Sequence, residues 1–161
     1  MEYLRTRLDK AVSVDAIYTI HYFEYTKDFA YSGEMHDFWE MVYIDGGDVI
    51  AVTDGLGREL NQGQVIFHKP MEIHAHVSDG VVPNNMLVVS FTTKSSAMDF
   101  FDKKIFTLDK TGKTLLTLFI NEAKNALGRV PGLNEDLLDI QKNSNSKAMA
   151  VSASFRIVMV I

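Results

Sequence analysis

The sequence predicts a mainly β fold, an antiparallel sandwich or barrel followed by a helical region. In the first two thirds of the chain, short segments rich in Val, Ile, Tyr and Phe alternate with turn formers, which is typical of strands. No segment between them has the length of the crossover helix that a parallel sheet needs. Beyond Thr93 the apolar residues recur at helical spacing. We therefore expect a β-barrel over residues 1–94 and a helical region over 95–161.

Six segments of the first part are the predicted strands. Turn formers separate them, for example DGG at 45–47 and NQG at 61–63. Because these connections are short, neighbouring strands are expected to pair in antiparallel fashion. The predicted strands are 17–25, 38–45, 47–54, 63–69, 73–78 and 85–93.

Helices are predicted in the second part. Residues 95–104 form a short helix with Ser95 or Ser96 as its cap, and residues 113–127 form a longer one that Gly128 ends. After the break "GRVPG", a weaker acidic helix precedes an apolar tail without a stop signal. Such a tail indicates either that the chain normally continues or that the tail packs on a partner.

The longer helix carries an apolar stripe that is either core against the barrel or a dimer interface. Because a barrel fills its own interior, we favour the interface and expect a homodimer through the C-terminal helices. The stripe consists of Leu115, Leu116, Phe119, Ile120, Ala123, Ala126 and Leu127.

Composition excludes several classes of protein. The chain has 161 residues, a formal net charge of -5 and no cysteine. A nucleic-acid-binding surface is basic, so none is expected on this chain, and disulfides, thiolate metal sites and a cysteine nucleophile are excluded. The N-terminus has no apolar signal core, and no apolar run approaches the roughly 20 residues of a membrane span. We expect a cytoplasmic protein that does not contact a membrane.

Residues 33–50 place a histidine and two acids in an otherwise apolar segment. Charged groups are costly on a buried face unless something pairs with them. In a continuous strand, Glu34, His36 and Glu40 share one face, near the barrel mouth. Phe38 lies on that face too, and Trp39 lies on the other.

A later strand carries His74 and His76 on one face. If it lies beside the first strand, imidazoles and carboxylates converge. Such a set suits Mn, Fe, Zn or Ni.

These residues resemble the first motif of the cupin family. That motif has His-x-His, three or four residues, Glu, six residues and Gly. This chain has Glu34-x-His36-x3-Glu40-x6-Gly47, which departs from the motif only at Glu34.

The second cupin motif runs Gly-x5-Pro-x-Gly-x2-His. Here Gly63 and His74 stand at the right separation, whereas Lys69 and Met71 replace the proline and the glycine. The resemblance implies a double-stranded β-helix, or jelly-roll, barrel. It also implies ligand positions at His36, Glu40 and His74.

A second resemblance covers most of the chain. Residues 36–77 are similar to the N-terminal ligand-sensing cupin domain of AraC-type transcription regulators, with a Gly63-Gln64 step and Pro70 four residues before His74. Residues 100–127 resemble the helical region through which those proteins dimerise. The DNA-binding half that follows in that family is absent here, and the acidic "NEDLLD" after "GRVPG" does not suit a recognition helix.

This resemblance implies an effector pocket without a metal and without catalytic residues. The predicted ligand-binding residues are His36, Phe38, Glu40, His74 and Trp39. In the alternative, Glu34, His36, Glu40 and His74 hold a divalent transition metal (Zn, Fe, Mn or Ni).

Plainer interpretations stay open. His36 and Glu40 form a hydrogen-bonded pair that serves only the barrel, His68 and His76 are surface or strand-edge residues, and His21 has no role.

Two functions follow. The first is a small-molecule effector-sensing and dimerisation domain of an AraC-type regulator, which contacts DNA only through a domain outside this chain. The second is a small metal-dependent enzyme, such as a dioxygenase or isomerase. A non-catalytic structural or sugar-binding cupin is a third, weaker interpretation.

Overall fold

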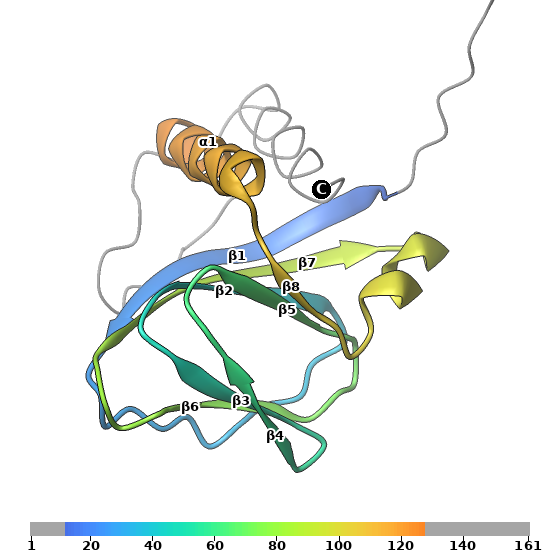
Figure 1. Ribbon diagram of the computed structural model, residues 1–161. Coiled ribbons are helices and arrows are strands. Elements are labelled where there is room, and N and C mark those ends of the chain that lie inside the picture. The colour runs from blue at the N-terminus through green and yellow to red at the C-terminus, as the bar shows by residue number, and fades with distance from the viewer. Residues whose placement is uncertain (1–11, 128–161) are drawn as a thin grey trace, which may run out of the picture.

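The computed structural model describes residues 12–127, which form a barrel of strands with one long helix outside it (Figure 1). A 3-10 helix, η1, connects the seventh and eighth strands. The elements are β1 (Val14–Tyr25), β2 (Trp39–Gly46), β3 (Val49–Thr53), β4 (Leu56–Leu60), β5 (Gln64–His68), β6 (His74–Ser78), β7 (Asn84–Thr93), η1 (Ser96–Phe101), β8 (Ile105–Thr107) and α1 (Lys110–Leu127).

The strands form two antiparallel sheets. One sheet has the order β1-β7-β2-β5-β8, and the other has the order β4-β3-β6. Figure 1 shows the smaller sheet on the side of the barrel away from α1. The predicted fold class, a mainly β jelly-roll barrel followed by a helical segment, is confirmed.

Strand β2 is covered on both faces, as its two apolar faces predict. Val42 and Ile44 belong to a core cluster inside the barrel, which also contains Val49 of the smaller sheet. Met41 and Tyr43 point the other way, into a second cluster outside the barrel. The larger sheet therefore separates two hydrophobic cores.

The turn after β2 depends on a glycine. Gly47 has a φ of 70°, and a Cβ there would lie 2.5 Å from the carbonyl oxygen of Pro83. Glycine is the residue that accepts a positive φ at little cost.

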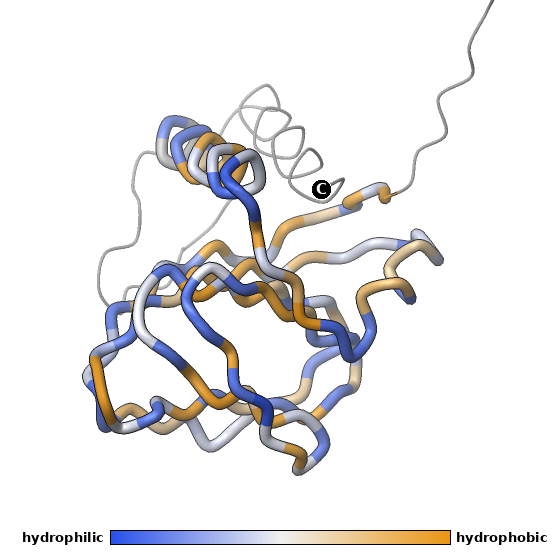
Figure 2. The backbone as a smooth tube through the Cα atoms, in the orientation of Figure 1, coloured by the Kyte–Doolittle hydropathy of each residue, from blue (hydrophilic) through white to orange (hydrophobic). Residues whose placement is uncertain are grey.

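Helix α1 covers the outer face of the larger sheet. Leu116, Phe119 and Ala123 are buried in the outer cluster, and Leu115 and Ile120 pack against it. Figure 2 shows hydrophobic and hydrophilic residues alternating along this helix. These five residues of the predicted stripe are thus core against the barrel.

Several boundaries differ from the predictions. Residues 95–104 contain a 3-10 helix, and Ser95 occupies its cap position without a side-chain cap bond. Strands β4 and β8 were not predicted. β8 lies beyond residue 94, in the predicted helical region, yet pairs with β5.

The predictions for Gly128, the acidic helix and the apolar tail lie outside the described residues. Within residues 12–127, no helix is both long and apolar enough to cross a membrane.

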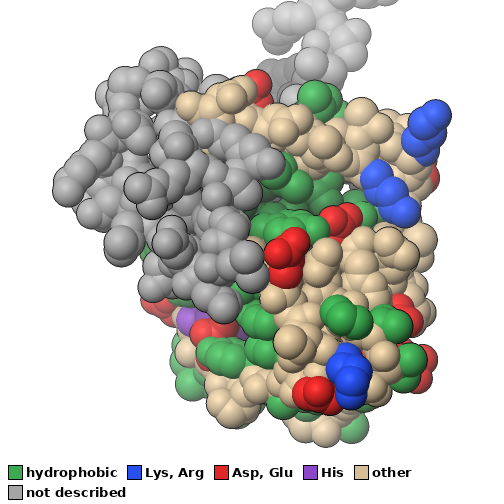
Figure 3. Space-filling view, turned by 90° about the vertical axis from the view of Figure 1, so that its left-hand side faces the viewer, with side chains coloured by type: hydrophobic (Ala, Val, Ile, Leu, Met, Phe, Trp, Pro, Cys, Tyr) green, Lys and Arg blue, Asp and Glu red, His purple; other side chains and the backbone are tan. Residues whose placement is uncertain are grey.

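The described part of the face in Figure 3 has scattered Lys and Arg side chains and no continuous basic surface. This distribution is in line with the acidic net charge.

Candidate metal centre and ligand cavity

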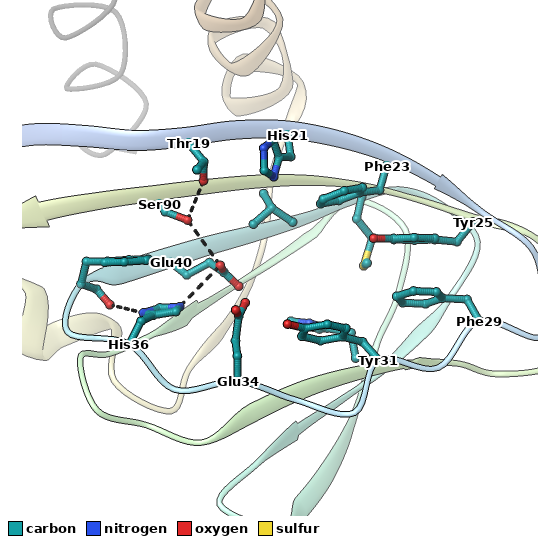
Figure 4. A pocket seen from close by; sticks show the side chains of 14 residues that line it. Thr19, His21, Phe23, Tyr25, Phe29, Tyr31, Glu34, His36, Glu40 and Ser90 are labelled. Atoms are coloured by element: carbon teal, nitrogen blue, oxygen red, sulfur yellow. Dashed lines mark hydrogen bonds and ion pairs between the residues drawn. The ribbon is translucent and has the colours of Figure 1, made fainter. Parts of the chain in front are cut away.

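A cavity of about 390 Å³ opens inside the barrel. One end is polar and contains Glu34, His36 and Glu40 (Figure 4). The other end is aromatic. Its side chains are Phe23, Tyr25, Phe29 and Tyr31.

The polar end is built by a bent segment, so Glu34, His36 and Glu40 do not lie on one continuous strand. Gly33 has a φ of 102°, and the strand begins only at Trp39. Glu34 forms an isolated antiparallel bridge with His74, with backbone N–H···O distances of 2.9 and 3.0 Å. The bend brings Glu34 to His74, across from β2.

Four side chains converge at this end. One ligand atom from each of Glu34, His36, Glu40 and His74 lies within 4.8 Å of the others. The Nε2 atom of His36 lies 3.7 Å from Glu40 Oε2, and the Nε2 atom of His74 lies 3.3 Å from Glu40 Oε1. The Oε1 atom of Glu34 lies 3.8 Å from His74 Nε2. The structure therefore brings together all four residues of the alternative metal prediction.

The two imidazoles are oriented by backbone carbonyls. His36 Nδ1 lies 3.0 Å from the carbonyl oxygen of Phe38, and His74 Nδ1 lies 3.0 Å from that of Glu72. A carbonyl only accepts, so each Nδ1 carries a proton and donates it. Both Nε2 atoms are buried without a hydrogen-bond partner among the described residues. This arrangement, with Nδ1–H anchored and Nε2 turned to the site, is that of metal-binding histidines.

Glu40 is the electrostatic centre of the cluster. Burial acts to raise its pKa, but the neighbouring imidazoles of His36 and His74 outweigh burial and lower the pKa well below its usual range. Burial acts to lower the pKa of His74, but the Glu40 carboxylate raises it overall. Ser90 donates a hydrogen bond to Glu40 Oε2 at 3.4 Å, and Thr19 donates one to Ser90 at 2.8 Å.

The residues present fit a divalent metal. Two imidazoles and two carboxylates suit Zn, Fe, Mn or Ni. The two buried Nε2 atoms face carboxylates but make no hydrogen bond among the described residues, which is otherwise costly. Three of the four residues line the cavity, whereas His74 lies behind it at 1% exposure. A small molecule in the cavity would therefore reach the cluster directly.

A second histidine pair lies beneath the cluster, and the interpretation of His68 and His76 as surface residues is wrong. Both are buried, at 0% and 5% exposure. His68 Nδ1 lies 3.1 Å from Glu72 Oε2, and His68 Nε2 lies 3.2 Å from His76 Nε2. Burial lowers the pKa of His76 to about 3 and also lowers that of His68. The two rings are therefore neutral near pH 7.

Trp39 does not line the cavity, so its prediction as a ligand-binding residue is wrong. It belongs to the outer cluster that α1 covers, because β2 turns odd-numbered side chains outward. Phe38 does line the cavity and stacks on His36 with ring centroids 3.8 Å apart.

Sequence reasoning missed the aromatic end of the cavity. His21, Phe23 and Tyr25 are alternate residues of β1 that line the cavity. Their spacing of two was the available signal. Phe29 and Tyr31 follow in the irregular segment after β1, where no periodicity marks them.

Comparisons with known proteins concern the fold. No protein-family model matches the sequence, and no curated protein matches it. Among solved structures, a predicted oxalate decarboxylase from Thermotoga maritima is similar, with 18% identity, a TM-score of 0.46, and coverage of 47% of this chain and 67% of that one.

Two further structures are named as cupins. A cupin superfamily protein from Desulfitobacterium hafniense has 16% identity and a TM-score of 0.43, covering 55% of this chain and 84% of that one. A Cupin 2 conserved barrel domain protein from Salinispora arenicola has 18% identity and a TM-score of 0.42, covering 63% and 95%. These likenesses concern the barrel architecture alone and carry nothing about activity.

Proposed function

We propose that the chain is a small-molecule-binding module whose barrel cavity takes an organic effector, as in the sensing domain of AraC-type regulators. The observation that carries this proposal is the cavity of about 390 Å³ with a polar end and an aromatic end. Its volume lies at the lower end of the range for small-molecule sites, roughly 300–1,000 Å³. A cavity of this kind suits one small ligand held by stacking at one end and polar contacts at the other.

The larger sheet contacts the cavity on one face and helix α1 on the other, so it can couple ligand binding to the helical region. Glu40 of β2 faces the cavity, and its neighbour Met41 packs in the outer cluster with Phe119 of α1. An effector that binds one arrangement of β2 and α1 better than another shifts the balance between them. In the regulator proposal, this shift reaches a homodimer interface in the C-terminal helices and a DNA-binding domain outside this chain. Sequencing the gene tests the regulator proposal, which requires that the coding sequence downstream of Ile161 encode a helix-turn-helix domain.

A metal-dependent enzyme is the second candidate. It is favoured by the buried Nε2 atoms of His36 and His74, which have no hydrogen-bond partner among the described residues. Glu34, His36, Glu40 and His74 would hold the ion. When bound, such an ion polarises an oxygen of a substrate or activates water. Ser90 would keep Glu40 in place, and Phe38 would hold the ring of His36 by stacking.

Metal analysis separates the two candidates. For the binding module, we expect protein purified without added metal to be folded and to contain no stoichiometric transition metal. Titration with Zn²⁺ then fills the vacant ligand set, and His74→Ala weakens this binding by at least about tenfold, because a ligand is lost. His21→Ala is the matched control, since His21 lines the same cavity outside the ligand set.

The opposite result favours the enzyme. Stoichiometric Fe, Mn, Ni or Zn in the purified protein, lost in both His36→Ala and His74→Ala but kept in His21→Ala, would contradict the metal-free module. Circular dichroism of each variant verifies that the barrel is folded.

A further inference from the structure

The aromatic end of the cavity forms a continuous stacking surface. The rings of Phe23 and Tyr25 stack with centroids 5.1 Å apart and planes 19° apart. Those of Tyr25 and Phe29 stack at 3.5 Å and 14°. A ligand ring can pack against the edges and outer faces of these stacked rings, because aromatic pairs gain energy from offset-stacked or edge-to-face contact beyond the area they bury.

The polar end presents hydrogen-bond acceptors. The carboxylates of Glu34 and Glu40 only accept. His36 uses its Nδ1–H on the carbonyl of Phe38, and its Nε2 faces the Glu40 carboxylate at 3.7 Å. The hydroxyls of Ser90 and Thr19 donate within the protein. A ligand that fills this end must therefore supply donors.

The charge at the polar end has one sign. No Lys or Arg is among the described residues that line the cavity. Two carboxylates, Glu34 and Glu40, line it. A carboxylate ligand would be repelled there, whereas a cation would be attracted.

The two ends lie close together. Burial raises the pKa of Tyr25 to about 12, with smaller contributions from Tyr31 and from the Glu40 carboxylate. Burial raises the pKa of Tyr31, and the neighbouring Glu34 carboxylate raises it further. Figure 4 shows Tyr31 and Glu34 side by side. A short linker is enough to join a ring at one end to a charged group at the other.

We infer that the cavity binds small aromatic cations, in which one aromatic ring carries a protonated amine on a short linker. The ring packs against the stacked side chains of the aromatic end, and the ammonium group donates to Glu34 and Glu40. The inference rests on the proposed binding function and names the chemical class of its ligand. A divalent metal ion is also positively charged, so the ammonium group and the metal ion compete for the carboxylates of Glu34 and Glu40.

Four probes test the inference on the whole chain after treatment with a chelator and dialysis. They are phenethylamine, phenylacetate, 2-phenylethanol and n-propylamine, measured by isothermal titration calorimetry. We expect phenethylamine to bind at least about tenfold more tightly than the alcohol and the acid, because of its charge-assisted hydrogen bonds. It should also bind about three- to tenfold more tightly than n-propylamine, because of stacking.

Paired variants locate the two contacts. Glu34→Gln should weaken phenethylamine binding about fivefold or more but leave 2-phenylethanol unaffected, whereas the exposed Glu59→Gln of β4 changes neither. Phe29→Leu keeps an apolar side chain but removes the ring, and should weaken both probes. Phe100→Leu is its control, since Phe100 is exposed and does not line the cavity.

Adding one equivalent of Zn²⁺ tests whether the ammonium group of the ligand and a metal ion bind the same carboxylates. If ammonium and metal use the same carboxylates, Zn²⁺ weakens phenethylamine binding. Unchanged or tighter phenethylamine binding with Zn²⁺ would overturn the inference, as would phenylacetate binding to the metal-free protein as tightly as the amine. Either result leaves the binding module standing, whereas no binding by any of the four probes would overturn both proposals.

Discussion

At the residue scale, the site depends on Gly33. Its φ of 102° turns the chain so that Glu34 bridges to His74. A Cβ at this position would lie 2.9 Å from the carbonyl oxygen of His74 and 3.2 Å from the Cβ of Ala75. Gly33→Ala should therefore lower the free energy of unfolding by about 1–2 kcal/mol for the backbone and about 1–3 kcal/mol for the clash. It should also weaken Zn²⁺ binding, because Glu34 is displaced.

Gly80→Ala is the matched control for this change. Gly80 has a φ of 82°, but a Cβ there meets nothing within 4 Å. The control should lose only the backbone contribution, about 1–2 kcal/mol, and bind Zn²⁺ normally. Urea unfolding and calorimetric titration measure both quantities, and equal effects of the two substitutions would contradict the role of Gly33.

The sequence predicted the membership of the ligand set better than its geometry. Glu34, His36, Glu40 and His74 do converge, but through a bend and a bridge across the barrel, which alternation along one strand does not describe. His68 and His76 were misjudged because burial of a polar ring depends on how the connection from β5 to β6 folds back, which brings His68 to Glu72 and to His76. Single-strand patterns contain no such information.

At the element scale, α1 shows how an apolar stripe is explained by packing. Phe119 is fully buried in the cluster on the outer face of the sheet, whereas its neighbour Leu118 is 53% exposed. Phe119→Ala should lower the free energy of unfolding by about 3–5 kcal/mol, through lost burial and a cavity. Leu118→Ala should change it by about 0.5 kcal/mol or less. Urea unfolding followed by circular dichroism checks both, and similar losses would contradict the packing of α1 on the barrel.

The strands that were predicted and those that were missed differ in composition. β2, β5 and β7 are rich in apolar and β-branched residues and were predicted nearly at their observed bounds. β4, with the sequence LGREL, is an edge strand whose residues are mostly exposed. β8 has three residues. An edge strand or a very short one is fixed by its pairing partner, so its own sequence carries little signal.

At the scale of the whole molecule, buried histidines link stability to pH. Burial lowers the pKa of His76 from its usual 6.5 to about 3, so the folded chain leaves this ring neutral where the unfolded chain protonates it. Between about pH 6.5 and 3 the unfolded state then binds more protons, and stability falls as pH falls. The pKa of His68 is lowered by burial in the same direction. His74 acts oppositely, because its pKa is raised and its contribution is lost as pH rises.

Replacing His76 isolates its share of this pH dependence. We expect the free energy of unfolding of the wild type to fall between pH 6.5 and 5, a window above the usual range of the carboxyl groups. In His76→Gln, which does not take up a proton, the fall should be shallower by about 1 kcal/mol per pH unit. Urea unfolding at pH 7.5, 6.5, 5.8 and 5 measures the two slopes. The ring resonances of His76 in the folded wild type provide the direct control, since they should not titrate in this window. A midpoint near 6.5 for those resonances, or parallel slopes for the two proteins, would show that His76 is not held neutral by the fold.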